Sequence, residues 1–155
     1  MQPYALIITG HGINCDEETA FAFHKAGATT AIKHIDDIIT GENLDQYQIL
    51  AFPGGFSYGD DTGSGNALAN RIRNSMWDRV HNFVQKDKLV IGICNGFQVM
   101  ANLGLVPALD YNYGERQVAL MHNDSARYTC RWVDLETQND SPWLRKIQKL
   151  SLPIA

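Results

Sequence analysis

The segment Leu89–Gln98 constrains the fold of this chain more than any other stretch. It is an apolar run that ends on Cys94, and glycines stand two positions to either side of that cysteine, at 92 and 96. A helical spacing of apolar residues then starts at Phe97. A strand that turns into a helix within one residue brings the two elements so close that only small residues fit beside the turn. The pattern therefore predicts a nucleophile elbow with Cys94 at its tip.

Cys94 is expected to stand at the start of that helix. The unpaired N–H groups and the positive end of the helix dipole favour a thiolate there, and the thiolate is the nucleophilic form of cysteine. The alternative is a core cysteine, because free cysteine is among the most buried residue types. A glycine–X–cysteine–X–glycine spacing after an apolar strand is the cysteine form of the elbow, so we interpret Cys94 as catalytic.

Short apolar runs alternate with helical patterns along the first two thirds of the chain. We expect strands at 4–9, 28–32, 48–52 and 89–93, helices at 16–26, 65–86 and after Cys94, and a loop at 36–45. This alternation predicts an α/β fold, a flavodoxin-like doubly wound and mostly parallel sheet with helices on both faces. Ligands bind such sheets at the carboxyl ends of the strands. Cys15, Gly54–Gly55 and Cys94 all follow strand ends, so one crevice is expected to gather them.

The remainder of the chain has a different pattern. Two further extended runs are expected at 118–121 and 127–136, and the second alternates as a half-exposed antiparallel strand does.

The glycine-rich turn Gly10–Cys15 lacks the third glycine of a dinucleotide-binding fingerprint, which argues against nicotinamide or flavin.

Two motifs resemble the triad-type, class I glutamine amidotransferases, in which the elbow has the pattern G-x-C-x-G-x-Q. That pattern is Gly92–Gln98 here, and Phe52–Asp61 (FPGGFSYGDD) resembles more specifically the glutaminase subunit or domain of phosphoribosylformylglycinamidine synthase. Asn14-Cys15-Asp16 matches the motif after that family's first strand. The resemblance covers Leu6 to Ala155 and stops before the family's domain is complete. It implies that residues 1–155 are the N-terminal portion of a single glutaminase domain whose C-terminal part is missing.

The resemblance implies an amidotransferase that hydrolyses glutamine through a cysteine thioester. The ammonia would pass to a synthase that amidates formylglycinamide ribonucleotide in de novo purine biosynthesis, a ligase reaction that forms a C–N bond. The expected partners are glutamine and the synthetase subunit or domain of that enzyme. The glutaminase domain is expected to need no metal or organic cofactor, and ATP and Mg²⁺ belong to the site of the partner synthase.

Each chemical step also needs particular residues. Cys94 would be the nucleophile, and the backbone N–H groups of Asn95 and, by the resemblance, Gly55 would form the oxyanion hole. Asn123 and Ser125 match the family's N-x-S turn beside the glutamine site, although an ordinary Asx turn explains them equally well. The full set of expected substrate-binding residues is Gly54, Phe56, Gln98, Asn123 and Ser125.

The triad also needs a histidine oriented by a carboxylate. In the resembling family this is a His-Pro-Glu type motif near the end of the domain, and none of the five histidines here is followed by Pro-Glu. Ser151–Ala155 resembles the run that leads into the family's H-G-E-G segment. The 155 residues alone are therefore expected to be almost inactive, and an exposed strand edge is expected to permit self-association.

Composition narrows the alternatives. A net charge of −4 and a pI of about 5.6, without a basic run, argue against nucleic acid and anionic membranes as partners. Three widely spaced cysteines fit neither a disulfide framework nor a zinc site, and the absence of a long apolar run indicates a soluble cytoplasmic protein. A non-catalytic flavodoxin-like binding module and a DJ-1/PfpI-like cysteine enzyme stay open as alternatives. The Phe52–Asp61 run and Gln98 favour the amidotransferase.

Overall fold

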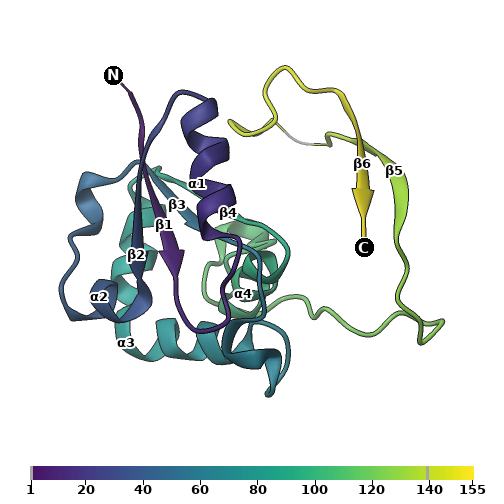
Figure 1. Cartoon of the computed structure of the whole chain (residues 1–155), viewed down its shortest axis with the longest axis horizontal. Helices are drawn as coiled ribbons and strands as arrows, with labels where there is room; N and C mark the ends of the chain where they lie inside the picture. The colour runs from purple at the N-terminus through teal and green to yellow at the C-terminus, as the bar shows by residue number, and fades with distance from the viewer. Residues whose placement is uncertain (1, 139) are drawn as a thin grey trace. The chain divides into compact units, whose positions relative to one another are not determined.

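The computed structural model describes residues 2–138 and 140–155. The chain forms two compact units, one that ends at Leu120 and one that comprises Met121–Ala155 (Figure 1). A single domain over residues 1–155 stays a prediction.

A parallel sheet of four strands forms the centre of the first unit. Its order is β2–β1–β3–β4, and all three neighbouring pairs are parallel. Central strands β1 and β3 are almost fully buried, as expected for continuous apolar runs covered on both faces. The predicted doubly wound α/β architecture is confirmed. The strands are β1 (Tyr4–Thr9), β2 (Thr29–His34), β3 (Ile49–Phe52) and β4 (Leu89–Gly92).

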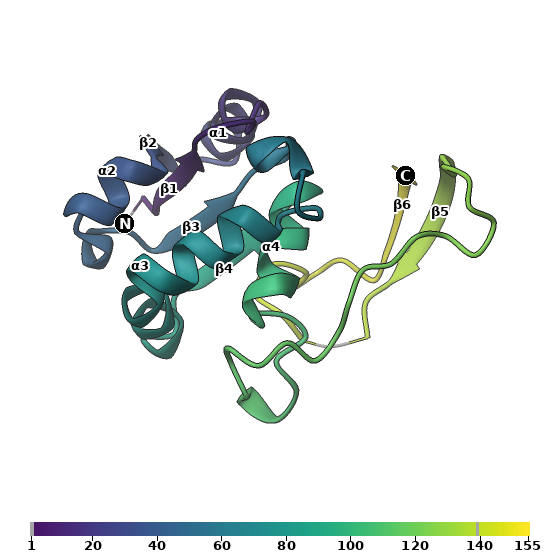
Figure 2. The same ribbon diagram turned by 90° about the horizontal axis from the view of Figure 1, so that it is seen from below.

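Helices cover both faces of the sheet. Helix α1 lies along β1 and β2, and α3 and α4 pack against each other on the opposite side (Figure 2). The helices are α1 (Asp16–Lys25), α2 (Ile35–Thr40), α3 (Asn66–Gln85) and α4 (Asn95–Leu103), with short 3₁₀ helices η1 (Leu44–Gln46), η2 (Ser57–Asp60) and η3 (Leu109–Tyr111). Across the described residues, none of the helices combines the length and the apolar character that crossing a membrane requires.

The main core lies between the sheet and α3. Leu6, Ile8, Leu50 and Phe52 project from β1 and β3 toward it. The apolar stripe predicted along the longest helix is confirmed, because its side chains are buried in this core at helical spacing. Its buried members are Leu68, Ile72, Met76, Val80 and Phe83.

The sequence predicted a loop at 36–45, and this prediction is wrong. The segment contains most of α2 and part of η1. His34 caps α2 by accepting a hydrogen bond at Nδ1 from the N–H of Asp36 (3.2 Å), and Ile35 and Ile38, three residues apart, are fully buried. A helix of six residues is too short to show a helical period of apolar residues. The acidic composition of the segment therefore suggested a loop.

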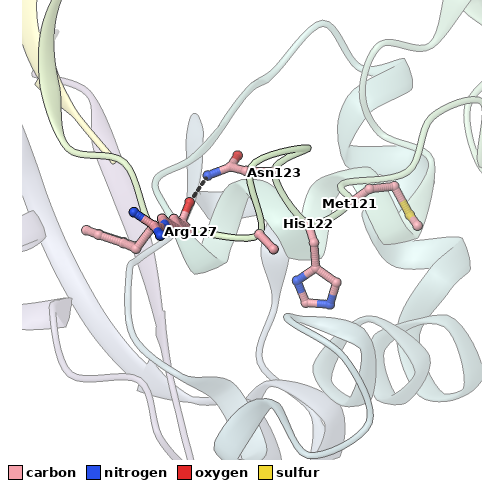
Figure 3. A pocket seen from close by; sticks show the side chains of 6 residues that line it. Met121, His122, Asn123 and Arg127 are labelled. Atoms are coloured by element: carbon pink, nitrogen blue, oxygen red, sulfur yellow. Dashed lines mark hydrogen bonds between the residues drawn. The ribbon is translucent and has the colours of Figure 1, made fainter.

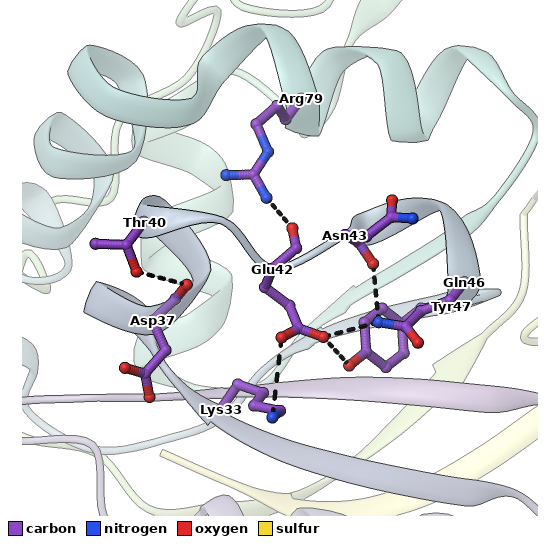
Figure 4. A network of polar contacts seen from close by, with 8 residues as sticks. All are labelled: Lys33, Asp37, Thr40, Glu42, Asn43, Gln46, Tyr47 and Arg79. Atoms are coloured by element: carbon purple, nitrogen blue, oxygen red, sulfur yellow. Dashed lines mark hydrogen bonds and ion pairs between the residues drawn. The ribbon is translucent and has the colours of Figure 1, made fainter.

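A polar network holds this segment in place (Figure 4). The Glu42 carboxylate accepts hydrogen bonds from Tyr47 Oη (2.6 Å) and Gln46 Nε2 (2.8 Å). Burial is the main cause that raises the pKa of Tyr47, and its hydrogen bond to Glu42 is the next. The Tyr47 hydroxyl therefore stays a donor. Arg79 of α3 donates to the backbone carbonyls of Ile38 (2.7 Å) and Glu42. These contacts join α2 and the segment that precedes β3 to the long helix α3.

Two antiparallel strands, β5 (Arg131–Glu136) and β6 (Lys149–Ile154), form the second unit's sheet, with Val133 opposite Leu152. The predicted antiparallel strand is confirmed, but it begins at Arg131 instead of 127. Residues 118–121 form no strand, since none of the described segments pairs with them. Trp132 and Ile154 are exposed on this ribbon, and its self-association stays a prediction.

The packing of α4 against β3 depends on Gly96. A Cβ at this position would lie 1.9 Å from the carbonyl oxygen of Phe52, and a Cβ on Gly92 would lie 2.6 Å from the carbonyl oxygen of Gly96. Both neighbours are backbone atoms that cannot rotate away. Glycine is therefore required at both positions by close approach, as the sequence predicted.

We predict that Gly96→Ala destabilises the first unit by more than about 3 kcal/mol, because the added methyl overpacks a backbone contact. Gly54→Ala is the matched control, since its Cβ would meet its nearest neighbours at 3.5 Å, which is ordinary contact. It is expected to change stability by less than about 1 kcal/mol. Urea denaturation of both variants measures the difference, and equal stabilities would contradict this account of the packing.

Candidate active site

Cys94 lies in the two-residue connection between β4 and α4. Strand β4 ends at Gly92, α4 begins at Asn95, and Cys94, directly before the helix, has φ of +54° and ψ of −112°. Such a conformation is rare for a residue with a side chain and typically costs roughly 1–3 kcal/mol. The predicted elbow geometry is confirmed. The catalytic role of Cys94 stays a prediction that this strained turn supports.

The loop after β3 lies against the elbow. The position that a Cβ of Gly54 would take is 3.5 Å from Cys94 Cβ and 3.5 Å from Cys15 Sγ. The backbone of Gly54 therefore stands between the two cysteines, and its carbonyl accepts hydrogen bonds from the N–H groups of Asn14 (3.4 Å) and Cys15 (3.3 Å). The predicted gathering of the three strand ends at one place is confirmed.

The backbone pairing of Gly55 does not use its own N–H group. Gly55 and Ile13 form an isolated antiparallel bridge, in which the Phe56 N–H donates to the Gly12 carbonyl (2.7 Å) and the Asn14 N–H donates to the Gly54 carbonyl. This is the pairing in which the two facing residues exchange no hydrogen bond. Within the described residues, the Gly55 N–H consequently has no backbone acceptor, as an oxyanion-hole donor requires.

Only glycine fits at position 55. Its φ is +147°, and a Cβ there would lie 2.5 Å from the carbonyl oxygen of Gly12. The second expected donor, the Asn95 N–H, is the first N–H of α4 and has no carbonyl four residues earlier within the helix. Both donors are thus free for a ligand, and both belong to segments that adjoin Cys94.

The side chain of Asn95 ties the elbow to the loop after β3. It is 1% exposed, and its Oδ1 accepts a hydrogen bond from the Ser57 N–H (3.1 Å). Its Nδ2 donates to Asp60 Oδ1 and to Gln98 Oε1, each at 3.0 Å. The buried amide therefore uses both of its donors and its acceptor. It fixes the relative positions of the two segments that carry the expected oxyanion donors.

The sequence did not indicate this network. It predicted only a backbone role for Asn95, and for Asp60 a capping or loop role without catalysis. Asp60 Oδ1 also accepts from the Gly65 N–H (3.2 Å), just before α3. Gln98, expected to bind substrate, is half-buried with its carbonyl oxygen engaged by Asn95. Its amide nitrogen is the part left for a ligand.

Charge distinguishes Cys94 from the other thiols. All three cysteines are exposed and free, so accessibility alone does not separate them. Cys15 also precedes a helix, but the first turn of α1 carries Asp16, Glu17 and Glu18, whose negative charge opposes the positive field of that helix end. The first turn of α4 has no acidic residue. The helix field at Cys94 is therefore not offset within its own first turn.

Apolar side chains are exposed around the elbow. Phe56, an expected substrate-binding residue, is 65% exposed, and Ile93 and Phe97 on either side of Cys94 are also exposed. Phe56 stands on the same loop as Gly55, and its substrate-binding role stays a prediction.

Asn123 and Ser125 lie in the second unit. Asn123 Nδ2 donates to the Arg127 carbonyl (2.8 Å; Figure 3). The Arg127 N–H donates to Ser125 Oγ (3.3 Å), so both residues close a turn. An open pocket of about 600 Å³ adjoins this turn, and it is lined by Met121, His122, Asn123, Ala126, Arg127 and Tyr128. The two residues thus close a turn, but Asn123 donates its Nδ2 instead of accepting through its side-chain oxygen as in an Asx turn. A substrate role for either residue stays a prediction.

Comparisons with known proteins agree with the geometry. The chain matches the CobB/CobQ-like glutamine amidotransferase domain over residues 2–155. It is 56% identical over 142 residues to phosphoribosylformylglycinamidine synthase subunit PurQ of Methanococcus maripaludis, covering 91% of this chain and 52% of that relative. It is 40% identical over 153 residues to the same subunit of Dehalococcoides mccartyi, covering 97% and 59%.

A solved structure, described as the structure of PurLQS from Thermotoga maritima, has the same fold. The match has a TM-score of 0.77 at 30% identity and covers 99% of this chain and 66% of that one. The chain spans about half the length of the curated relatives that it matches.

We predict that Cys94 is the most reactive of the three thiols, because its helix field is not opposed by first-turn carboxylates. Substoichiometric iodoacetamide or a glutamine-like chloroketone, followed by peptide mapping, should modify Cys94 several-fold faster than Cys15 or Cys130. The matched control is Cys94→Ser, in which total labelling should fall sharply. Faster labelling of Cys15 would refute the assignment.

We predict that Asn95→Asp destabilises the chain by more than about 2 kcal/mol at pH 7, because a second carboxylate would face Asp60 where a donor stood. The two carboxylates raise each other's pKa in the folded state, so the loss should shrink as the pH falls and a proton is shared. Asn70→Asp, on the exposed face of α3, is the control. Urea denaturation at pH 7 and pH 5 measures both, and a loss that is independent of pH would contradict the network.

Proposed function

The chain belongs to the CobB/CobQ-like glutamine amidotransferase domain family, and we propose that it carries the nucleophile and oxyanion hole of a glutaminase. The observation that supports this most is the elbow, where a strained cysteine adjoins a loop whose Gly55 N–H is left without a backbone acceptor. Family membership favours this function over a non-catalytic flavodoxin-like module or a DJ-1/PfpI-like enzyme.

In the proposed reaction, the Cys94 thiolate attacks the side-chain carboxamide carbon of glutamine. The negative charge that develops on the carboxamide oxygen is stabilised by the N–H groups of Gly55 and Asn95, and loss of one such donor typically reduces the rate by ~10² to 10³. The C–N bond breaks, the nitrogen takes up a proton and ammonia leaves, which creates a thioester on Cys94. Water then hydrolyses the thioester to glutamate and restores the thiol.

The proton transfers need a general base. We propose that it is a histidine of the His-Pro-Glu type motif that the family resemblance implies, in the part of the relatives' length that this chain does not span. None of its own histidines is followed by Pro-Glu. General acid–base catalysis contributes ~10² to 10⁴ in rate, so the base decides whether Cys94 turns over.

The acceptor of the ammonia is proposed from the named relatives. This chain is similar across nearly all of its own length to about half of subunit PurQ of phosphoribosylformylglycinamidine synthase. We infer that the ammonia passes to the synthetase subunit or domain of such an enzyme, which amidates formylglycinamide ribonucleotide in purine biosynthesis. ATP and Mg²⁺ would act at the synthetase site, the glutaminase step would need neither, and a reactive thiol suits the reducing cytoplasm.

The test is glutamine hydrolysis by the 155-residue chain against a chimera in which the remaining segment of the Methanococcus maripaludis relative is appended. The chimera is expected to turn over at least ~10²-fold faster, because it regains a general base. Cys94→Ser in the chimera should abolish turnover. Equal turnover from both proteins would mean that a histidine of this chain is the base and would refute the proposal.

The acceptor is tested separately. The active chimera, mixed with the synthetase subunit, formylglycinamide ribonucleotide and ATP, should support glutamine-dependent amidation. Ammonia supplied directly bypasses the glutaminase and serves as the control. Amidation with ammonia but not with glutamine would refute the acceptor while leaving the hydrolysis intact.

A further inference from the structure

Three side chains that the proposed glutaminase does not use gather at the carboxyl ends of β1 and β2. They are His11 in the loop after β1, His34 at the end of β2 and Asp36 in the first turn of α2. One ligand atom of each lies within 4.8 Å of the others. The parallel register places Thr9 beside His34, so the loop that carries His11 leaves the sheet next to the other two residues.

We propose that His11, His34 and Asp36 bind a divalent transition-metal ion of the Zn²⁺ class. Two imidazoles and one carboxylate are ligands that Zn²⁺, Co²⁺ and Ni²⁺ accept, and three protein ligands leave a fourth position for water. The site is separate from the chemistry proposed for Cys94, which uses no metal.

Binding of an ion at His34 would replace a local hydrogen bond. His34 Nδ1 accepts the Asp36 N–H at 3.2 Å as the cap of α2, so its lone pair becomes available to an ion only when that bond is given up. Nδ1 is also 3.5 Å from Asp36 Oδ2. Bonds of about 2.0–2.1 Å at tetrahedral angles separate neighbouring zinc ligands by about 3.3 Å, so these two atoms already have nearly the spacing that an ion requires.

Arg71 of α3 orients the carboxylate. Its guanidinium donates to Asp36 Oδ1 and to Tyr58 Oη (2.8 Å), which leaves Oδ2 directed toward His34. A fixed positive charge beside the carboxylate orients it but also weakens its attraction for a cation.

His11 completes the set from an exposed position. Its ring is 5.3 Å from that of His34 and 5.6 Å from that of Tyr58, measured between centroids. Because the side chain is exposed, a change of rotamer can bring its nitrogen to the ion. The His11 carbonyl accepts the Tyr58 N–H (2.9 Å), and the Gly12 carbonyl accepts the Phe56 N–H, so an ion at this site would also brace the loop that carries Gly55.

The test uses Co²⁺ and Zn²⁺ titrated into the whole chain by calorimetry and by Co²⁺ absorption. A Cys15→Ser, Cys94→Ser, Cys130→Ser background removes the thiols, which also bind these ions. One ion per chain is expected, with absorption typical of nitrogen and oxygen ligands. His11→Asn and His34→Asn should each weaken binding by more than about 10-fold. Asparagine retains the cap of α2, so the second variant keeps its fold.

Two further variants make the test specific. His24→Asn, an exposed histidine on α1, should leave the affinity unchanged. Arg71→Gln should raise the affinity, since it removes the neighbouring cation, whereas a role of Arg71 confined to folding would not produce tighter binding. The proposal would be overturned if the triple-serine protein with all its histidines failed to bind one equivalent, or if His11→Asn and His34→Asn bound the ion as tightly as that background does.

Discussion

The contact between Gly96 and the carbonyl of Phe52 is the constraint on which the rest of the site depends. It allows α4 to start directly at the end of the sheet and to pack on β3 without an intervening side chain. The polypeptide can then reverse only through a residue with positive φ, and that residue is Cys94. The strain at Cys94 is stable because the packing on either side of the turn leaves no alternative path.

The same contact determines which segments meet. With α4 held on β3, the loop after β3 must pass beside the elbow, and Gly54 lies between Cys15 and Cys94. The bridge between Ile13 and Gly55 then joins the loops after β1 and β3 in the pairing that leaves the Gly55 N–H unused. An anion-stabilising donor is thus produced by backbone topology, and a side chain at position 55 would be incompatible with it.

Buried polarity gives the site its rigidity. Asn95 is almost fully buried, and its amide satisfies groups on the loop after β3, on Asp60 and on α4. A buried amide with every capacity used is stable in one arrangement only, because any shift leaves a donor or acceptor unpaired. A similar arrangement at the end of β2 uses Arg71 of α3 and His34 to orient Asp36 of α2. Both networks lie at the carboxyl edge of the sheet, where short loops from different strands converge.

The sequence by itself determined the α/β alternation, the elbow and the meeting of three strand ends, because apolar periodicity and glycine spacing report local backbone and burial. It predicted the first strand, the first helix and the long helix nearly to the residue. Only the tertiary structure decided the helix hidden in 36–45, the buried role of the Asn95 side chain and the grouping of His11, His34 and Asp36. These depend on hydrogen bonds and contacts between residues up to tens of positions apart, and no local pattern in the chain encodes such pairings.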